Sequence, residues 1–248
     1  EFHGDKKDLN NIKFSSTSNS EKTSFFNLKI KDLNFGYKPN NKIIESLNFE
    51  INKGDSIGVL GPSGSGKTSL LDILLGINRN FNGKLILNNN LELTSNNFYL
   101  WKNKCAYLPQ DNFIFDGTII ENITFKEKLD KKENKQLFSI FEKLKLDNFV
   151  NSLEFKENTN LGERGSVLSG GQKQKISLAR SLYHNREVFF LDEALNALDQ
   201  DNQDEIIRTL DNLCQKDKKT FVLISHDLRI LSFCNKIYMF NNKKLILK

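Results

Sequence analysis

Gly61-Pro62-Ser63-Gly64-Ser65-Gly66-Lys67-Thr68 is the stretch that decides the fold of this chain. It fits the pattern G-x-x-x-x-G-K-[ST] at every position. It lies between an apolar run at 56–60, expected to be a strand, and a helical pattern at 68–75. That context matters because the glycines free backbone N–H groups to turn toward phosphate, and the helix N-terminus adds partial positive charge. The sequence therefore predicts a phosphate-binding loop for a nucleoside triphosphate.

Three side chains at the end of this stretch have separate expected roles. Lys67 is expected to reach the β- and γ-phosphates, and Thr68 to place its hydroxyl on Mg²⁺. Ser69, the next residue, is assigned to the same nucleotide site. A turn rich in glycine and serine that matches by chance is the alternative interpretation, and the flanking strand and helix argue against it.

Composition excludes several classes of protein. The chain has 248 residues, of which 27% are charged and 38% hydrophobic, and this balance is typical of a soluble folded protein. The net charge is +5, but the lysines are spread along the chain and form no stripe that would favour nucleic acid. The three cysteines are too few and too scattered for a disulfide framework or a metal site. No apolar run approaches the length of about 18 residues that a membrane helix needs.

The N-terminal third predicts a linker followed by strands. Residues 1–25 are polar and without pattern, so we expect a linker that is poorly ordered or lies on the surface. Apolar residues alternate with polar ones from Phe26 to Ile30 and again over 47–51, which predicts half-exposed strands. A turn at 52–55 leads into the strand before the phosphate-binding loop. This opening predicts an antiparallel β-subdomain.

The rest of the chain predicts a helical insertion and an α/β core. The pattern from 118 to 153 is helical, with a capping box at Asp130 and Glu133, and a further helix is expected at 170–184. Strand, helix and strand then alternate to the end, which predicts a parallel sheet with covering helices. The predicted fold class is therefore α/β, a P-loop core with an added β-subdomain and an inserted helical subdomain at about 111–184. Ligands of such sheets bind at the carboxyl ends of the strands.

A second motif carries a resemblance to a known family. Leu168-Ser169-Gly170-Gly171-Gln172 is followed by an apolar run that ends in Asp192 and Glu193. The run LSGGQ resembles the signature of the ATP-binding cassette (ABC) family. Over about residues 26–248 the chain resembles the nucleotide-binding domain of an ABC transporter. An adenine-stacking aromatic, a Q-loop glutamine, a D-loop and a switch histidine are also matched, at Tyr37, Gln110, 194–199 and His226.

This resemblance implies ATP and Mg²⁺ as ligands. It implies that Thr68 and Gln110 supply oxygen ligands and that Asp192 holds the ion through water, which suits an ion that keeps several waters. It makes Glu193 the general base beside the attacking water, with Gln110 and His226 completing the catalytic set at the γ-phosphate. The alternatives are that Asp192 and Glu193 are an acidic surface pair and that His226 is structural. The position of these residues directly after expected buried strands argues against both alternatives.

The signature residues are implied to serve a partner. In the family they lie at a helix N-terminus and clamp the γ-phosphate of ATP held by a second nucleotide-binding domain. Two ATP molecules are then buried between domains packed head to tail. On this chain the residues in question are Ser169, Gly170, Gly171 and Gln172. Tyr37 is the expected adenine platform, with a core or surface tyrosine as the alternative.

Two positions depart from the family pattern. The D-loop usually carries serine where this chain has Asn196. Asparagine can still hydrogen-bond across the dimer, so we expect communication between the sites to be altered rather than lost. The switch histidine lies in Ser225-His226-Asp227, whereas exporters often have Ala-His-Arg, and the observed pattern also occurs in importer ATPases.

Two other segments favour an exporter. Residues 113–123 resemble the exporter run LF-x-GT-I-x-ENI, and residues 161–165 resemble VGERG, which lies against the coupling helices of the membrane domain. The polar segment 1–25 and a first residue other than Met predict a transmembrane domain fused before Glu1. The expected location is the cytoplasmic face of the inner cell membrane, for a fragment that is itself soluble. The expected type is a half-transporter resembling lipid or lipid-linked-oligosaccharide flippases.

Three alternatives stay open at this point. A separately encoded importer ATPase would begin with Met and lack the segment 161–165. A non-transport ABC ATPase acting on ribosomes or DNA would carry paired cassettes or a long coiled coil. A catalytically silent binding module is disfavoured by the intact Lys67, Asp192, Glu193 and His226. The cargo is not indicated, because the membrane segments choose it.

Overall fold

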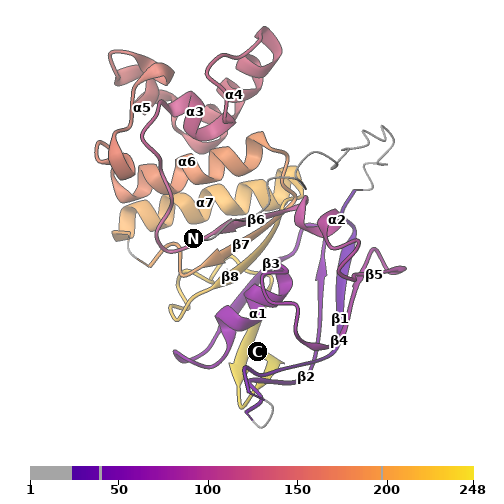
Figure 1. The fold of residues 1–248 in the computed structure, drawn as a ribbon. Coiled ribbons are helices and arrows are strands. Elements are labelled where there is room, and N and C mark those ends of the chain that lie inside the picture. The colour runs from indigo at the N-terminus through magenta and orange to yellow at the C-terminus, as the bar shows by residue number, and fades with distance from the viewer. Residues whose placement is uncertain (1–23, 39–40, 197) are drawn as a thin grey trace, which may run out of the picture.

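The computed structural model of the protein describes residues 24–38, 41–196 and 198–248. Its strands form two sheets, one of four strands and one of six, and its helices gather mainly beside the larger sheet (Figure 1). This mixed α/β architecture confirms the predicted fold class. The predicted linker lies outside the described residues except for Ser24 and Phe25.

The smaller sheet is antiparallel, as the alternating pattern predicts. Its order is β2-β1-β4-β5. The strands are β1 (Asn27–Phe35), β2 (Ile44–Asn52), β4 (Asn82–Leu87) and β5 (Leu91–Glu92). Leu28 pairs with Ile51 on one side and with Leu87 on the other, so that the apolar faces of three strands meet.

The predicted alternation is wrong at the start of this sheet. Phe26 is 67% exposed, whereas Phe25, which falls within the predicted linker, is fully buried. The ring of Phe25 lies 5.5 Å from that of Trp101, centroid to centroid. Asn27 also points inward, because its amide nitrogen donates to Glu50 and to Asn89. The folded part of the chain therefore includes Phe25.

The larger sheet carries the phosphate-binding loop. Its order is β10-β9-β3-β8-β7-β6, and all neighbouring pairs are parallel except β9 with β10. The strands are β3 (Ser56–Leu60), β6 (Cys105–Leu108), β7 (Val188–Asp192), β8 (Thr220–Ile224), β9 (Lys236–Asn241) and β10 (Lys244–Leu247). Since β3, β7 and β8 are parallel neighbours, the segments that follow Leu60, Asp192 and Ile224 emerge at one edge of the sheet.

Helices cover both faces of this sheet, as Figure 1 shows. Alternate residues of β7 divide between two cores. Phe189 and Leu191 pack with α6 (Gly170–Tyr183) and α7 (Gln200–Asp217). Val188 and Phe190 pack with α1 (Lys67–Leu74) and the antiparallel sheet. The short helix α2 (Tyr99–Lys102) is tied to α1 by the indole N–H of Trp101, which donates to the carbonyl of Leu74 at 2.6 Å. The site thus rests on a core buried from both sides.

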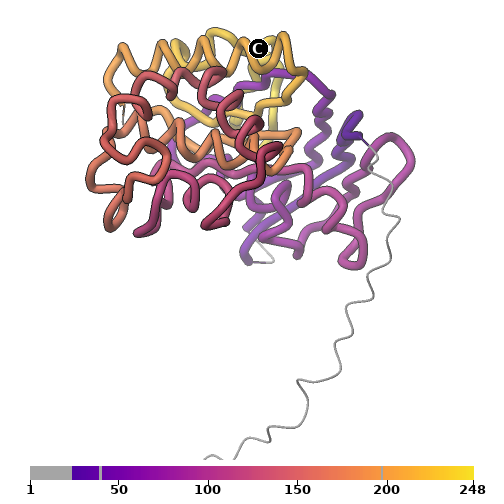
Figure 2. Tube along the Cα trace, turned by 90° about the horizontal axis from the view of Figure 1, so that it is seen from above, coloured from indigo at the N-terminus to yellow at the C-terminus, as the bar shows by residue number. Residues whose placement is uncertain are grey.

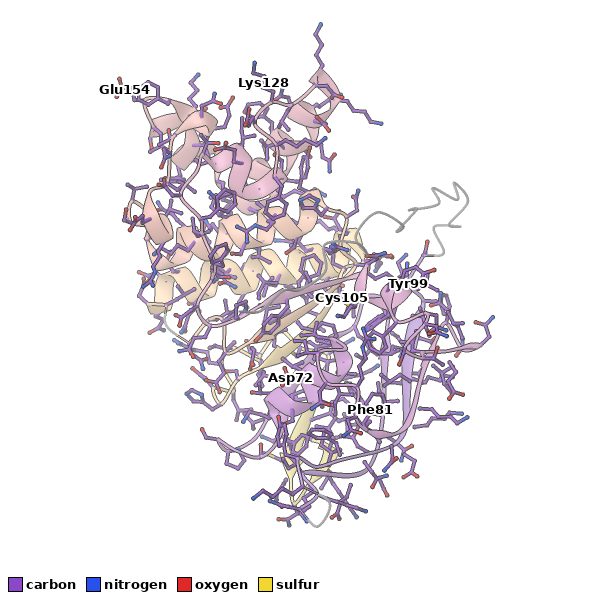
Figure 3. All side chains as sticks on the ribbon, viewed as in Figure 1. Asp72, Phe81, Tyr99, Cys105, Lys128 and Glu154 are labelled. Atoms are coloured by element: carbon purple, nitrogen blue, oxygen red, sulfur yellow. The ribbon has the colours of Figure 1, made fainter. Side chains whose placement is uncertain are left out.

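The helical segment lies apart from the antiparallel sheet (Figure 2). It contains α3 (Ile119–Thr124), α4 (Lys131–Leu144), α5 (Asp147–Ser152) and two 3-10 turns, η1 (Lys156–Asn158) and η2 (Glu163–Gly165). The predicted capping box of Asp130 and Glu133 begins α4. In Figure 3, Lys128 and Glu154 label the end of this segment, and Asp72 on α1 lies on the far side of the sheet from them. No helix in the described ranges combines the length and apolar character that crossing a membrane requires.

Candidate functional site

The phosphate-binding loop has the shape that its glycines permit. Gly66 caps the N-terminus of α1 with a φ of 111°, in the region that side chains with a Cβ rarely adopt. A Cβ at this position would lie 2.6 Å from Cγ2 of Ile43, so there is no space for one. Because no side chain caps α1, its first backbone N–H groups stay available for a ligand. The loop and helix together have the geometry of an anion site.

Lys67 is folded into its own loop. Its side chain is buried, with only 6% of the residue exposed, and Nζ donates to the carbonyls of Gly61 and Pro62 at 2.9 and 2.8 Å. Burial lowers the pKa of Lys67, and the negative charges of Glu193 and Asp192 oppose that shift. The buried hydroxyl of Ser65 has no hydrogen-bond partner in the described part of the chain. A phosphate oxygen would satisfy both the ammonium and this hydroxyl.

One cleft gathers three of the predicted motifs. It has a volume of about 450 Å³ and lies where the phosphate-binding loop, the segment after β6 and the end of β7 meet. The predicted residues that line it are Ser63, Gly64, Lys67, Thr68, Gln110, Asp192 and Glu193. Tyr107 and Asp111 also line the cleft, although the sequence assigns neither of them a role at the nucleotide site. Their sequence signal is proximity to Gln110, since Tyr107 lies three residues before it and Asp111 directly follows it.

The cleft contains an oxygen-donor set that fits Mg²⁺. Thr68 and Gln110 line the same cleft as the Asp192 carboxylate at the end of β7. Burial raises the pKa of Asp192, the neighbouring Glu193 raises it further, and Thr68 and Lys67 oppose the shift. Hydroxyl, amide and carboxylate oxygens are the hard ligands that Mg²⁺ prefers. An ion here would relieve the repulsion between the two adjacent carboxylates.

The side chain of Asn196 lies between Glu193 and His226 and contacts both. Glu193 has a φ of 51°, and its backbone N–H donates to the carbonyl of Ile224 at 3.0 Å. Nδ2 of Asn196 donates to Oε2 of Glu193 at 3.2 Å and lies 3.3 Å from Nδ1 of His226. Nδ1 of His226 is 4.0 Å from Oε1 of Glu193. The sequence predicts that Asn196 acts across a dimer, whereas here its amide contacts residues of its own chain.

The signature residues begin a helix of their own. Ser169 caps α6, its Oγ accepting from the N–H of Gln172 at 3.2 Å, while Oε1 of Gln172 accepts from the N–H of Ser169 at 2.8 Å. Among the residues that the structure describes, the cleft around Lys67 is lined by none of the four signature residues. Gly170 lines an adjoining cleft of about 670 Å³, which shares Gln110 and Asp111 with the cleft around Lys67. The chain does not bring its signature to its own phosphate-binding loop.

Tyr37 lies beside the helix that follows the phosphate-binding loop. The residue is 65% exposed, and its ring meets the ring of Phe35 edge-on, with centroids 5.0 Å apart. Its hydroxyl is 3.2 Å from Oγ of Ser69, so these two predicted nucleotide contacts are neighbours. A cavity of about 250 Å³, lined also by the Phe81 labelled in Figure 3, opens next to Tyr37.

Comparisons with known proteins identify the family to which the chain is similar. The family model described as ABC transporter matches residues 44–196. The mitochondrial iron-sulfur clusters transporter ATM1 of Debaryomyces hansenii is 30% identical over 214 residues, which are 86% of this chain and 30% of that protein. The multidrug resistance-like ATP-binding protein MdlA of Buchnera aphidicola is 34% identical over 217 residues, or 87% of this chain and 37% of that protein.

A solved structure, that of a bacterial Atm1-family ABC exporter with ATP bound, matches with a TM-score of 0.76 and 25% identity. The match covers 90% of this chain and 38% of that one. The chain therefore spans about a third of the length of these relatives. The exporter-type resemblance is confirmed, and the importer alternative is not supported. The finer expectation of a lipid or oligosaccharide flippase stays a prediction.

Family membership follows from the extent of the match. The residues matched by the family model, 44–196, make up more than half of the chain and run from β2 through the phosphate-binding loop and the signature to Asn196. The chain belongs to the ABC transporter family and corresponds to its ATPase domain.

Proposed function

We propose that this chain binds ATP with Mg²⁺ in the cleft around Lys67 and hydrolyses it to power an ABC exporter. The observation that carries the proposal is the convergence of Lys67, Thr68, Gln110, Asp192 and Glu193 on one cleft. A cation, an oxygen-donor set and a separate carboxylate are the parts that phosphoryl transfer to water requires.

Binding uses the loop and the start of α1. Phosphate oxygens accept from the uncapped backbone N–H groups at the helix N-terminus, where the helix dipole favours negative charge. The Lys67 ammonium exchanges the two loop carbonyls for phosphate oxygens, which are stronger acceptors because they are charged. Tyr37 supplies an aromatic face for the adenine, and its hydroxyl contact with Ser69 keeps it close to the phosphate end of the site.

Thr68, Gln110 and Asp192 are the residues that would hold Mg²⁺. When bound, the ion neutralises charge on the β- and γ-phosphates. The chain's own contribution is to present a hydroxyl, an amide and a carboxylate at the mouth of one cleft. Asp192 is positioned for this by β7, whose apolar residues are buried on both faces of the sheet.

Glu193 is the proposed general base. It follows Asp192 directly, yet its left-handed backbone conformation and the hydrogen bond to Ile224 turn the chain there. Its carboxylate accepts from Asn196 and retains acceptor capacity for the hydrogen of an attacking water. His226, on the neighbouring segment after β8, is the proposed contact to the γ-phosphate, and Gln110 joins it in the catalytic set. The two strands bring base and histidine together from distant parts of the sequence.

Assembly and location are part of the proposal. The site of a second nucleotide-binding domain, packed head to tail, would be completed by Ser169, Gly170, Gly171 and Gln172. The exposure of Ser169 and Gly170 supports this, and so does the fact that neither lines the chain's own cleft around Lys67. A transmembrane domain fused before Glu1 would place this part of the protein at the cytoplasmic face of the inner membrane. The exposed Phe113, in the exporter-like segment 113–123, supports contact with that domain.

The test is ATP hydrolysis by the Glu193→Gln variant. The loss of a general base costs about 10²–10⁴ in rate, so we expect Mg²⁺-dependent turnover to disappear while ATP binding persists. Glu92→Gln is the matched control, because Glu92 is an exposed residue paired with Lys84 on the antiparallel sheet. Turnover of Glu193→Gln equal to that of the unaltered chain would refute the assignment.

A further inference from the structure

We propose that Asn196 is a positioning residue whose amide holds His226 in the Nε2–H tautomer and ties it to Glu193 of the same chain. Its catalytic consequence rests on the proposed function, whereas its geometry does not. Asn196 lies where the segment after β7 passes the segment after β8, and it contacts both Glu193 and His226. The side chain of His226 is 68% exposed, so packing gives its ring little support.

The direction of the amide follows from a buried serine on one side and the Glu193 carboxylate on the other. Ser225 is almost fully buried, and its Oγ accepts from the backbone N–H of Asp227 at 3.0 Å. The hydroxyl hydrogen of Ser225 is then donated to Oδ1 of Asn196, 3.2 Å away. Turning the amide over would bring Oδ1 to the position 3.2 Å from Oε2 of Glu193, where two acceptors would face each other. The amide nitrogen therefore faces the carboxylate.

The amide nitrogen then sets the proton position on His226. Nδ2 of Asn196 carries two hydrogens. One is donated to Oε2 of Glu193, and the other points to Nδ1 of His226 at 3.3 Å. Nδ1 can accept it only when it carries no hydrogen, so the neutral ring must carry its proton on Nε2. His226 thereby keeps an N–H donor on the side away from Asn196, available to an anionic oxygen.

A direct contact between Glu193 and His226 would not hold the proton of His226 on Nε2. Nδ1 of His226 lies 4.0 Å from Oε1 of Glu193, which is beyond hydrogen-bond distance. Such a contact, if it shortened, would favour a hydrogen on Nδ1, the opposite tautomer. The asparagine amide is a donor to both partners, and it links them without competing for the proton on Nε2.

The experiment observes the imidazole nitrogens of the nucleotide-free chain by ¹⁵N nuclear magnetic resonance at alkaline pH, where histidine is neutral. The chain has three histidines, and the His226→Gln variant assigns the signals of His226. We expect a pyrrole-type Nε2 and a pyridine-type Nδ1 in the unaltered chain. Asn196→Asp keeps the shape but replaces the donor with an acceptor, so it should reverse this preference. Asn196→Ser, which is too short to bridge both partners, should give a mixture of tautomers.

Two controls separate this effect from general damage to the fold. His184, whose ring stacks on that of Phe125 in the helical segment, should keep its tautomer in every Asn196 variant. Asn212→Asp makes the same chemical change on the exposed face of α7, and it should leave His226 unaffected. ATP turnover should fall about tenfold in Asn196→Asp, which is less than the loss of a general base costs. It should remain unchanged in Asn212→Asp.

The outcomes are distinct. A proton on Nδ1 of His226 in the unaltered chain, or an unchanged tautomer in Asn196→Asp, would overturn the proposal. Both measurements are made without nucleotide, so they hold whether or not the chain hydrolyses ATP. Failure of the proposed function would appear instead as full turnover in Glu193→Gln.

Discussion

The phosphate-binding loop and the signature segment are both glycine-rich turns that begin a helix, but the two helix N-termini are capped differently. Gly66 caps α1 without any side-chain hydrogen bond. Ser169 caps α6 with a full capping box, in which it exchanges hydrogen bonds with Gln172. The first turn leaves backbone donors open beside a buried lysine, whereas the cap of the second satisfies the N–H groups of Ser169 and Gln172 at an exposed position.

This difference separates a helix N-terminus without a side-chain cap from one that is partly satisfied without a ligand. Four N–H groups at each helix N-terminus need partners, and a cap supplies one or two of them. In the proposed nucleotide site, phosphate supplies the missing partners at α1. At α6 the cap already satisfies part of the helix N-terminus, so fewer N–H groups remain for a phosphate, and we expect its binding there to need a second surface. We therefore expect a primary site on α1 and, on α6, a surface that acts together with a second domain.

Lys67→Ala should have the largest effect on the α1 side of this comparison. Removing the ammonium deletes hydrogen bonds between charged groups, each worth about 1.5–3 kcal/mol, so ATP affinity should fall by about 10- to 100-fold. Fluorescent-nucleotide titration of the chain measures this. Lys143→Ala, which removes an exposed ion pair with Asp217, should leave affinity unchanged. Equal affinity in Lys67→Ala and the unaltered chain would contradict the assignment of the primary site.

A matched pair of glycine substitutions sharpens the comparison through stability. Gly66→Ala forces a Cβ into a left-handed backbone and against Ile43, so the free energy of unfolding should fall by about 1–3 kcal/mol. Gly170→Ala meets only the flexible end of Leu198 at 3.1 Å and gains helix propensity, so its change should stay below about 1 kcal/mol. Urea unfolding of both variants gives the two values. A larger loss at Gly170 than at Gly66 would reverse the expected order.

Much of the primary site follows from local sequence. The strand–loop–helix around Lys67 and the apolar run ending at Asp192 are local patterns, and the structure forms each of them where predicted. The capping box at Asp130 is equally local. These predictions succeed because the hydrogen bonds and burial that define each pattern involve residues within a few positions of one another.

The contacts that could not be predicted are all between distant segments. Asn196 reaches His226 only because β7 and β8 are neighbours in the sheet, with Asp192 opposite Ile224, and sequence order does not specify that pairing. Phe25 is buried instead of Phe26 because Trp101, far along the chain, provides the surface that covers it. A period-2 pattern has no information about which of two adjacent phenylalanines meets such a partner.

Ser169→Ala tests the α6 side of the comparison with a smaller effect. Loss of an N-cap side chain costs about 0.5–2 kcal/mol of stability, and nucleotide affinity of the monomer should not change, because Ser169 does not line the cleft around Lys67. ATP-dependent dimerisation, measured by size-exclusion chromatography in the Glu193→Gln background, should weaken. Dimerisation that is as strong after the Ser169→Ala substitution as before it would argue against a site completed by a second domain.

Glu163→Ala should have the smallest effect in this chain. Glu163 begins the turn η2 just before the signature, its side chain is exposed, and it does not line the cleft around Lys67. Surface substitutions of this kind usually change stability by less than about 0.5 kcal/mol. ATP turnover of the chain should therefore stay within error of the unaltered protein.

In the longer transporter that we propose, Glu163→Ala should reduce the stimulation of ATP hydrolysis by transport substrate. The physical reason is that this surface would then transmit closure of the nucleotide site to the membrane domain, and closure can shift that domain only through contacts that differ between its two states. Turnover of the full-length variant, measured with and without transport substrate, gives the stimulation. A loss of turnover in the chain alone would mean that the turn before the signature serves its own nucleotide site, and the contrast between the α1 and α6 sides would no longer hold.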